Sequence, residues 1–185
     1  MVDLRKQVAK LYQHHAEMPY ISSERDLAAW LTEVELSSNK LVPKRNMIRL
    51  AEGILPGDII LLWRIQFGTY TNETVISKYF EYTYGIDARA SLLHLIAQGY
   101  VVELSAHDSL DHVTAPFLRK ILKEKGIVNL NKLKKPELAA LIHAQVSEEA
   151  LGAHFPTRQY ALTAAGEQLL ANHPEVIAKH PKKKF

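Results

Sequence analysis

Residues 57–104 place the strongest constraint on the fold, because three apolar segments of helical length follow one another there and lead into a strand. The first, GDIILLWRIQF, is apolar on all sides and predicts a buried helix. The second, NETVISKYFEYTY, predicts another helix, which ends at Gly85. The third, DARASLLHLIAQG, predicts a helix that Asp87 caps and Gly99 stops, and YVVEL after it has the composition of a strand.

A second strand signal comes far downstream, in RQYALTAAGEQLL at residues 158–170. This segment predicts a short strand, a helix cap at Thr163 and then a helix. The connection within a hairpin is normally short, and a long one indicates a separate unit inserted at the hairpin tip. We therefore expect residues 100–104 and 158–162 to pair antiparallel, with residues 108–155 as the inserted helical unit.

These two fragments together resemble a winged helix-turn-helix domain. The resemblance rests on three helices followed by a strand, and on the pattern Y-x-L-T-x-x-G formed by Tyr160, Leu162, Thr163 and Gly166. It implies that the third helix is a recognition helix and that the paired strands form the wing. The residues that this helix would offer to a DNA groove are Arg89, His94 and Gln98. The same fold also serves for dimerisation or protein docking, so both kinds of partner stay open.

The inserted unit contains two short amphipathic helices joined by a basic linker. Thr114 can cap the first helix and Gly126 stops it, while Pro136 opens the second. The inward residues are Leu118, Ile121 and Leu122 in the first helix and Leu138, Leu141 and Ile142 in the second. Helices this short bury little surface, so we expect the linker and its surroundings to complete a small core. The residues expected to do so are Ile127, Leu130, Leu133 and Val146.

This arrangement resembles the SAP domain, a helix–linker–helix DNA-binding module. The residues that match its signature are Thr114, Leu118, Leu122, Gly126, Ile127, Lys134, Lys135, Leu138, Leu141 and Ile142. The chain departs from the signature in two ways: Leu133 stands where a SAP linker normally has glycine, and the linker VNLNKLKK is slightly longer. The resemblance implies contact with the phosphate backbone, which positions a protein without reading sequence. The contact residues expected here are Lys132, Lys134, Lys135, Arg119 and Lys123.

Basic charge is concentrated in two places along the chain. Residues 110–146 hold seven Lys and Arg against three acids, whereas the whole chain has a net charge of only +3. The second concentration is the C-terminal segment KHPKKKF, which we expect to be mobile unless bound. Lys182 and Lys183 in it are further expected DNA contacts. A solvated surface is the alternative explanation for both groups of lysines.

Residues 1–55 predict a helical region to which we assign no chemistry. The first segment carries Leu4, Val8, Leu11 and Tyr12 on one face and ends at Pro19. A second helix is predicted in SERDLAAWLTEVEL, with Ser23 as its cap, and a third segment from about Arg45 to Gly53. In the later segment SKYFEYTYG, Phe80 and Tyr84 are expected to pack in the core rather than stack on bases.

Several protein classes are disfavoured by the composition and the motifs. The absence of cysteine excludes a disulfide framework and thiol chemistry, and it fits a reducing cytoplasm. The most apolar stretch is interrupted by Pro56, Gly57, Asp58 and Arg64, so it predicts no membrane span. The sequence has no P-loop or nucleophile-elbow motif. The cluster His107, Asp108, Asp111 and His112 predicts a polar loop rather than a metal site. We therefore expect a non-enzyme without a cofactor or metal.

The sequence thus predicts a mainly α-helical protein with one small two-stranded hairpin. The expected parts are an N-terminal helical region (1–55), a winged-helix-like domain (56–107 and 156–178), a SAP-like insertion (108–155) and a basic tail (179–185). The leading hypothesis is a non-catalytic protein that binds duplex DNA largely independently of sequence. The alternative is a protein-interaction role, as an accessory or inhibitor protein of a phage or mobile element, with the winged helix as the docking surface. Self-association through the N-terminal helices belongs to that alternative.

Overall fold

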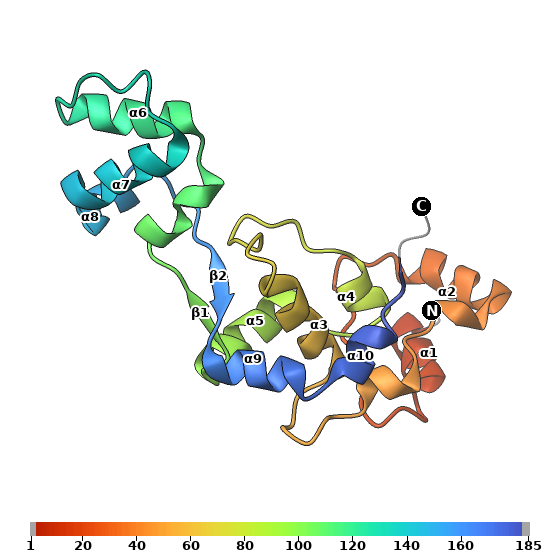
Figure 1. Ribbon diagram of the computed structural model, residues 1–185. Coiled ribbons are helices and arrows are strands. Elements are labelled where there is room, and N and C mark those ends of the chain that lie inside the picture. The colour runs from red at the N-terminus through yellow and green to blue at the C-terminus, as the bar shows by residue number, and fades with distance from the viewer. Residues whose placement is uncertain (1–2, 183–185) are drawn as a thin grey trace. The chain divides into compact units, whose positions relative to one another are not determined.

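The protein is mainly helical, with one small two-stranded antiparallel sheet (Figure 1), as the sequence predicts. The computed structural model describes residues 3–182. The α-helices are α1 (Leu4–Leu11), α2 (Leu27–Leu36), α3 (Pro56–Ile65), α4 (Tyr79–Tyr82), α5 (Ala88–Ala97), α6 (Ala115–Glu124), α7 (Lys135–Gln145), α8 (Glu148–Gly152), α9 (Ala164–Ala171) and α10 (Pro174–Ala178). The 3-10 helices are η1 (Ser38–Lys40), η2 (Lys44–Met47) and η3 (His107–His112), and the strands are β1 (Val101–Glu103) and β2 (Tyr160–Leu162).

The chain divides into two compact units. The first unit contains the chain up to Gln66, Val75–Val101 and the chain from Leu162 onward. The second unit contains Phe67–Thr74 and Val102–Ala161. The N-terminal helices therefore belong to the same compact unit as α3, α4 and α5.

The core of the first unit is built around α3. Most of the helix is apolar, and Ile59, Ile60, Leu61 and Leu62 are fully buried, as the sequence predicts. Helices α5, α9 and α10 pack against it. Asp58 closes the start of α3, because its carboxylate accepts a hydrogen bond from the Leu55 amide at 2.9 Å. Burial raises the pKa of this Asp58 carboxyl group.

A buried ion pair joins the N-terminal region to α4. The side chain of Arg25 is only 2% exposed, and its Nε and Nη2 lie 2.8 and 2.6 Å from Oε1 of Glu81. The guanidinium lies 4.0 Å from the ring centroid of Tyr82 and 5.1 Å from that of Trp30. The Ser22 amide donates to the same carboxylate oxygen at 2.9 Å. The Arg25–Glu81 pair is thus held by its own charges, by two aromatic rings and by a backbone amide.

Two details of the predicted N-terminal region are wrong. The cap of α2 is Asp26 and not Ser23, because the Asp26 carboxylate accepts a hydrogen bond from the amide three residues later at 3.0 Å. The segment Arg45–Gly53 does not continue as a helix after η2. The chain turns there instead, with the Leu50 amide donating to the Ile54 carbonyl at 2.8 Å and with Gly53 in the left-handed region at a φ of 80°.

Only the end of the second predicted helix, α4, is helical. Before it, Thr71 and Thr74 form a turn in which the Thr71 amide donates to Oγ1 of Thr74 at 2.8 Å and the Glu73 amide to Oγ1 of Thr71 at 3.2 Å. Local side-chain hydrogen bonds of this kind compete with helix formation. Thr71 also forms an isolated antiparallel bridge with Gln159, the residue before β2.

The third predicted helix is confirmed as α5. The Asp87 carboxylate caps it by accepting a hydrogen bond from the Arg89 amide at 3.0 Å, and Gly99 follows it with a φ of 80°. Leu92 and Leu95 of α5 are buried, and Phe80 and Tyr84 before it are buried as predicted.

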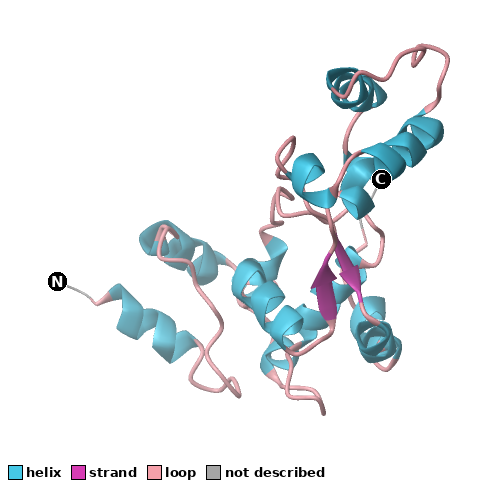
Figure 2. Ribbon diagram, turned by 90° about the vertical axis from the view of Figure 1, so that its left-hand side faces the viewer, coloured by secondary structure: helices cyan, strands magenta, loops and turns pink. Residues whose placement is uncertain are grey.

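The predicted antiparallel pairing of β1 and β2 is confirmed (Figure 2). The Leu104 amide donates to the Gln159 carbonyl at 2.8 Å, and the Thr163 amide donates to the Tyr100 carbonyl at 3.1 Å. One partner number rises as the other falls, which is the pattern of an antiparallel ladder. The pairing brings the two ends of the inserted segment together.

The Thr-x-x-Gly part of the downstream pattern fastens α9 to the end of α5. The Thr163 hydroxyl donates to the Gly99 carbonyl at 2.6 Å and accepts from the Gly166 amide at 3.1 Å. A β-carbon on Gly166 would overlap the carbonyl oxygen of Tyr100. Glycine is therefore required because a helix and a backbone carbonyl approach closely there.

The second unit folds around α6 and α7, and the small core predicted for it is confirmed. The buried residues of this core are Ala106, Leu110, Leu118, Ile121, Leu122, Leu130, Leu138, Ile142, Val146, Leu151 and Phe155. Ile127 and Leu133 of the linker pack against it and are partly buried. The contribution of η3 and α8 enlarges the core beyond the two helices that the sequence indicated.

Candidate nucleic-acid interface

The linker between α6 and α7, residues 127–134, is folded onto the side of α6. Gly126 ends α6 with a φ of 83°, and Asn129 turns the chain with a φ of 65°. Leu130 is then buried. Arg119 of α6 holds the linker in this position, because its Nε donates to the Leu130 carbonyl at 3.3 Å and its Nη2 to the Leu133 carbonyl at 2.9 Å.

Exposed lysines lie along α6 and the linker. The two carbonyls that Arg119 binds flank Lys132, so Lys132 is kept close to α6. The exposed lysines are Lys120, Lys123, Lys125, Lys132 and Lys134. Within residues 3–182, none of these five has a carboxylate at ion-pairing distance. Pro116, Arg119, Lys120, Lys123 and Glu124 line one shallow depression on α6. The unit therefore presents cations without internal partners.

Besides Arg119, two of the expected phosphate contacts take part in the fold of the unit itself, Lys135 through its side chain and Lys134 through its backbone amide. Lys135 is half-buried, and its Nζ donates to the Asp111 carbonyl at 2.7 Å. At the start of α7, the Glu137 carboxylate accepts a hydrogen bond from the Lys134 amide at 2.7 Å. This carboxylate places negative charge where a helix N-terminus would otherwise attract phosphate. Lysine side chains are thus better phosphate ligands here than the amides of α7.

Arg89, His94 and Gln98 lie in the first unit, on α5, and all three are exposed. At 100° per residue they share one half of the helix surface with Ala90, Leu93 and Ala97. Leu93 is 69% exposed. These six residues carry one positive charge and no acid, so this face is closer to neutral than the lysine-bearing surface of the second unit.

Of the C-terminal segment that the sequence predicts to be mobile, the structure describes residues 179–182, and within them His180 is docked. The ring of His180 lies 5.4 Å from that of Trp63, 5.0 Å from that of Tyr79 and 5.7 Å from that of Tyr84. Nδ1 of His180 lies 2.6 Å from the Tyr84 hydroxyl. Beyond this contact Lys182 is exposed, and Lys183 lies outside the described residues.

The protonation of this tail contact follows from its surroundings. Burial, together with the nearby Arg64 guanidinium, lowers the pKa of His180. Burial raises the pKa of Tyr84 to about 12. Both shifts favour the neutral forms of the two side chains, which share one hydrogen bond.

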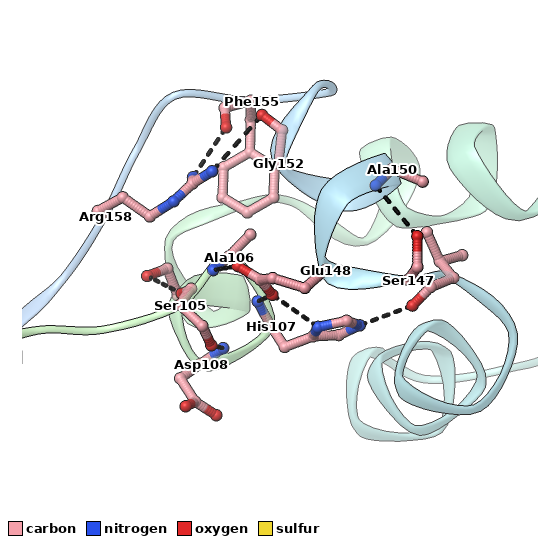
Figure 3. A network of polar contacts seen from close by, with 12 residues as sticks. Ser105, Ala106, His107, Asp108, Ser147, Glu148, Ala150, Gly152, Phe155 and Arg158 are labelled. Carbon is pink, nitrogen blue, oxygen red and sulfur yellow. Dashed lines mark hydrogen bonds and ion pairs between the residues drawn. The ribbon is translucent and has the colours of Figure 1, made fainter.

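A polar network that the sequence did not reveal lies around Glu148 in the second unit (Figure 3). The Glu148 carboxylate accepts hydrogen bonds from the amides of Ala106 and His107, and from Nδ1 of His107 at 2.7 Å. Burial opposes its charge, but these bonds outweigh burial and lower the pKa of Glu148. Nε2 of His107 lies 2.8 Å from the Val146 carbonyl. The His107 ring is thus held from both of its nitrogens.

Of the four polar residues singled out in η3, the two histidines form hydrogen bonds within the second unit. His107 belongs to the network around Glu148, and Nε2 of His112 lies 2.8 Å from Oε1 of Gln159. Asp108 and Asp111 are exposed. Over the part of the chain that the structure describes, no three His, Cys, Asp or Glu side chains are grouped as a metal ion requires.

Comparisons of the chain with protein-family models, with curated proteins and with solved structures found no match. Between residues 3 and 182, no helix has the length and apolar character needed to cross a membrane.

Proposed function

We propose that the protein binds duplex DNA without catalysing a reaction, through lysine contacts to the phosphate backbone from the α6–linker–α7 unit. The observation that carries this proposal is the set of exposed lysines, unpaired within residues 3–182, that surrounds the linker held by Arg119. Unpaired cations of this kind release counterions from DNA when they meet phosphates, at any base sequence. The resemblance to the SAP domain supports the same surface.

The residues of this surface have different roles in the proposal. The phosphate ligands are Lys120, Lys123, Lys132 and Lys134. Arg119 and Lys135 act by holding the linker and the start of α7, because their donors already bind backbone carbonyls. A substitution of Lys135 would disturb the unit as well as any contact, so it is unsuitable as a test of binding.

A protein-docking role is the second candidate, and the exposed face of α5 favours it. Leu93 is 69% exposed at the centre of a face that carries only Arg89 as a charge. An apolar, nearly neutral helix face gains more from a protein partner than from a phosphate backbone. In this alternative the winged-helix-like part of the first unit docks on a protein, as in an accessory or inhibitor protein.

The DNA proposal is tested by the salt dependence of binding to two unrelated duplexes. Fluorescence anisotropy would be measured from about 50 to 200 mM salt, where phosphate contacts weaken strongly. The variant Lys123→Gln/Lys132→Gln/Lys134→Gln removes up to three contacts, so the slope of log K against log salt should flatten by roughly two to three. Affinity should fall equally on both duplexes, and the fold should survive because these lysines are exposed.

A matched control removes the same charge from the first unit. The variant Lys6→Gln/Lys10→Gln/Lys40→Gln should leave the slope close to that of the natural protein, because the proposed contacts are elsewhere. Equal losses in both triple variants would mean that net charge, and not this surface, governs binding. Absence of binding at the lowest salt would reject the DNA proposal. Self-association that Leu93→Glu abolishes would then support the docking candidate.

A further inference from the structure

The first unit carries a second group of cations, which the sequence divides between distant segments. Arg45 follows the start of η2, Arg64 lies in α3, and Lys179 and Lys182 belong to the C-terminal end. Arg45 and Lys179 line the same cavity, which has a volume of about 140 Å³. The other residues that line it are Asn46, Leu50, Pro56, Thr83, Tyr84, Glu175, Val176 and Pro181. Two cations from distant parts of the sequence thus meet at one hollow.

The docked tail keeps these cations together. Val176 of α10 is buried, which fixes the helix that ends before Lys179. His180 is then held between the rings of Trp63, Tyr79 and Tyr84. The chain on both sides of His180 is therefore directed over this part of the first unit, and Arg64 lies close enough to His180 to affect its pKa.

The cavity has a positive balance, although one acid lines it. Within the described residues, Arg45, Arg64, Lys179 and Lys182 have no carboxylate at ion-pairing distance. Glu175 is engaged by His173, whose Nδ1 lies 3.1 Å from Oε1 of Glu175. Burial opposes the charge of His173, but its bonds to Glu52 and Glu175 outweigh burial and raise its pKa. Lys179 also lies close enough to the Glu175 carboxylate to help lower its pKa, and with two cations against this one acid the lining keeps a positive balance.

We propose that this cavity is a phosphate site, in which Arg45 and Lys179 hold one phosphate group and Arg64 and Lys182 extend the cationic surface to its neighbours along a DNA backbone. The volume of about 140 Å³ is several times the share of one water molecule, roughly 30 Å³, so a phosphate group has room. The inference rests on the proposed function for its ligand, but it places a separate contact on the first unit. Free phosphate offers the same chemistry, and the experiment distinguishes the two sources.

The first arm of the test measures DNA. Arg45→Gln/Lys179→Gln should flatten the salt slope by roughly two, because two phosphate contacts are lost. His180→Ala should flatten it by about one at most, because it releases mainly Lys182. The triple lysine variant of the second unit is measured beside them, and all variants are checked for unchanged thermal unfolding midpoints, except His180→Ala, which empties an aromatic contact.

The second arm uses inorganic phosphate and does not require DNA. The chain has two tryptophans, and Trp63 contacts His180 of the tail, so its indole NMR signal reports on the site. Replacing chloride by inorganic phosphate at equal ionic strength should shift the Trp63 signal in the natural protein and not in Arg45→Gln/Lys179→Gln. A shift without any DNA binding would identify free phosphate as the ligand.

The outcomes separate this inference from the proposed function. If Arg45→Gln/Lys179→Gln changes neither the slope nor the Trp63 signal while the second-unit variant flattens the slope, the phosphate site is overturned and the proposed function stands. If the cavity variant flattens the slope and the second-unit variant does not, the phosphate site stands and the proposed contact surface is wrong. A protein that responds to neither ligand overturns both.

Discussion

Replacement of Arg25 by alanine should destabilise the first unit more than any other single charge removal considered for this chain. Arg25 is almost fully buried, and its guanidinium contacts the Glu81 carboxylate at 2.6 and 2.8 Å. The substitution leaves the Glu81 carboxylate without its cation. It also removes the guanidinium that contacts the rings of Trp30 and Tyr82. The N-terminal helices should then separate from α4.

The magnitude follows from the burial of the two partners. Removing one member of a buried ion pair costs about 3–5 kcal/mol, and the 19% exposure of the Glu81 side chain places this pair at the lower end. Loss of the guanidinium–ring contacts with Tyr82 and Trp30 adds about 0.5–1 kcal/mol. The expected loss is about 3–4 kcal/mol, or a decrease of roughly 10 °C in the unfolding midpoint of a chain this long.

Tryptophan fluorescence in urea is a suitable assay, because Trp30 and Trp63 both lie in the first unit. Arg49→Ala is the matched control, since the Arg49–Glu17 pair has similar bond lengths but is 52% and 33% exposed. Exposed pairs contribute about 0–1 kcal/mol. If Arg25→Ala costs no more than Arg49→Ala, the buried pair does not hold the N-terminal region and the reasoning is refuted.

Three further predictions concern the first unit. Gly166→Ala should cost about 3 kcal/mol in urea unfolding, because the new methyl group meets the Tyr100 carbonyl; a neutral result would contradict the close approach. The stabilising contribution of His173, whose pKa is raised, should be complete below about pH 6.5 and lost as the pH rises through the raised pKa. It is measured as the difference in unfolding free energy between the natural protein and Glu52→Gln across pH. His180, whose pKa is lowered, should destabilise the protein as the pH falls below about 6.5, and His180→Phe should remove that loss.

The elements that the sequence predicts well are those with a complete local signal. The helices α5 and α6 form as predicted, each with an apolar stripe and a stopping glycine, Gly99 and Gly126. Thr114 stands at the N-cap of α6 as expected, but its side chain makes no capping hydrogen bond. The insertion in a hairpin follows from the spacing of two strand signals and a known limit on hairpin loops. These inferences need only neighbouring residues or chain length.

The features that the sequence does not indicate depend on partners distant in the chain. The segment before α4 is not helical because Thr71 pairs with Gln159 and forms a turn with Thr74, and these contacts outweigh the helical periodicity of the segment. The tail docks because the hydroxyl of Tyr84 lies against a histidine 96 residues later. From the sequence, Arg119 is expected to be a surface cation; in the structure it donates hydrogen bonds to two carbonyls of the linker. Periodicity, composition and charge counts describe only the local sequence, so they do not predict contacts between residues far apart in the chain.

The hydrogen bond between the Leu104 amide and the Gln159 carbonyl joins the two ends of segment 105–158, which affects the entropy of folding. Each doubling of an unstructured loop costs about 0.6 kcal/mol of closure entropy, so replacing a four-residue turn by an unfolded segment 105–158 would cost about 2 kcal/mol. If segment 105–158 folds before the two strands pair, its ends already lie side by side. It then connects the strands as a short loop would and avoids most of the closure cost. Such a segment can be acquired, exchanged or lost between two strands with little effect on the register of the surrounding chain.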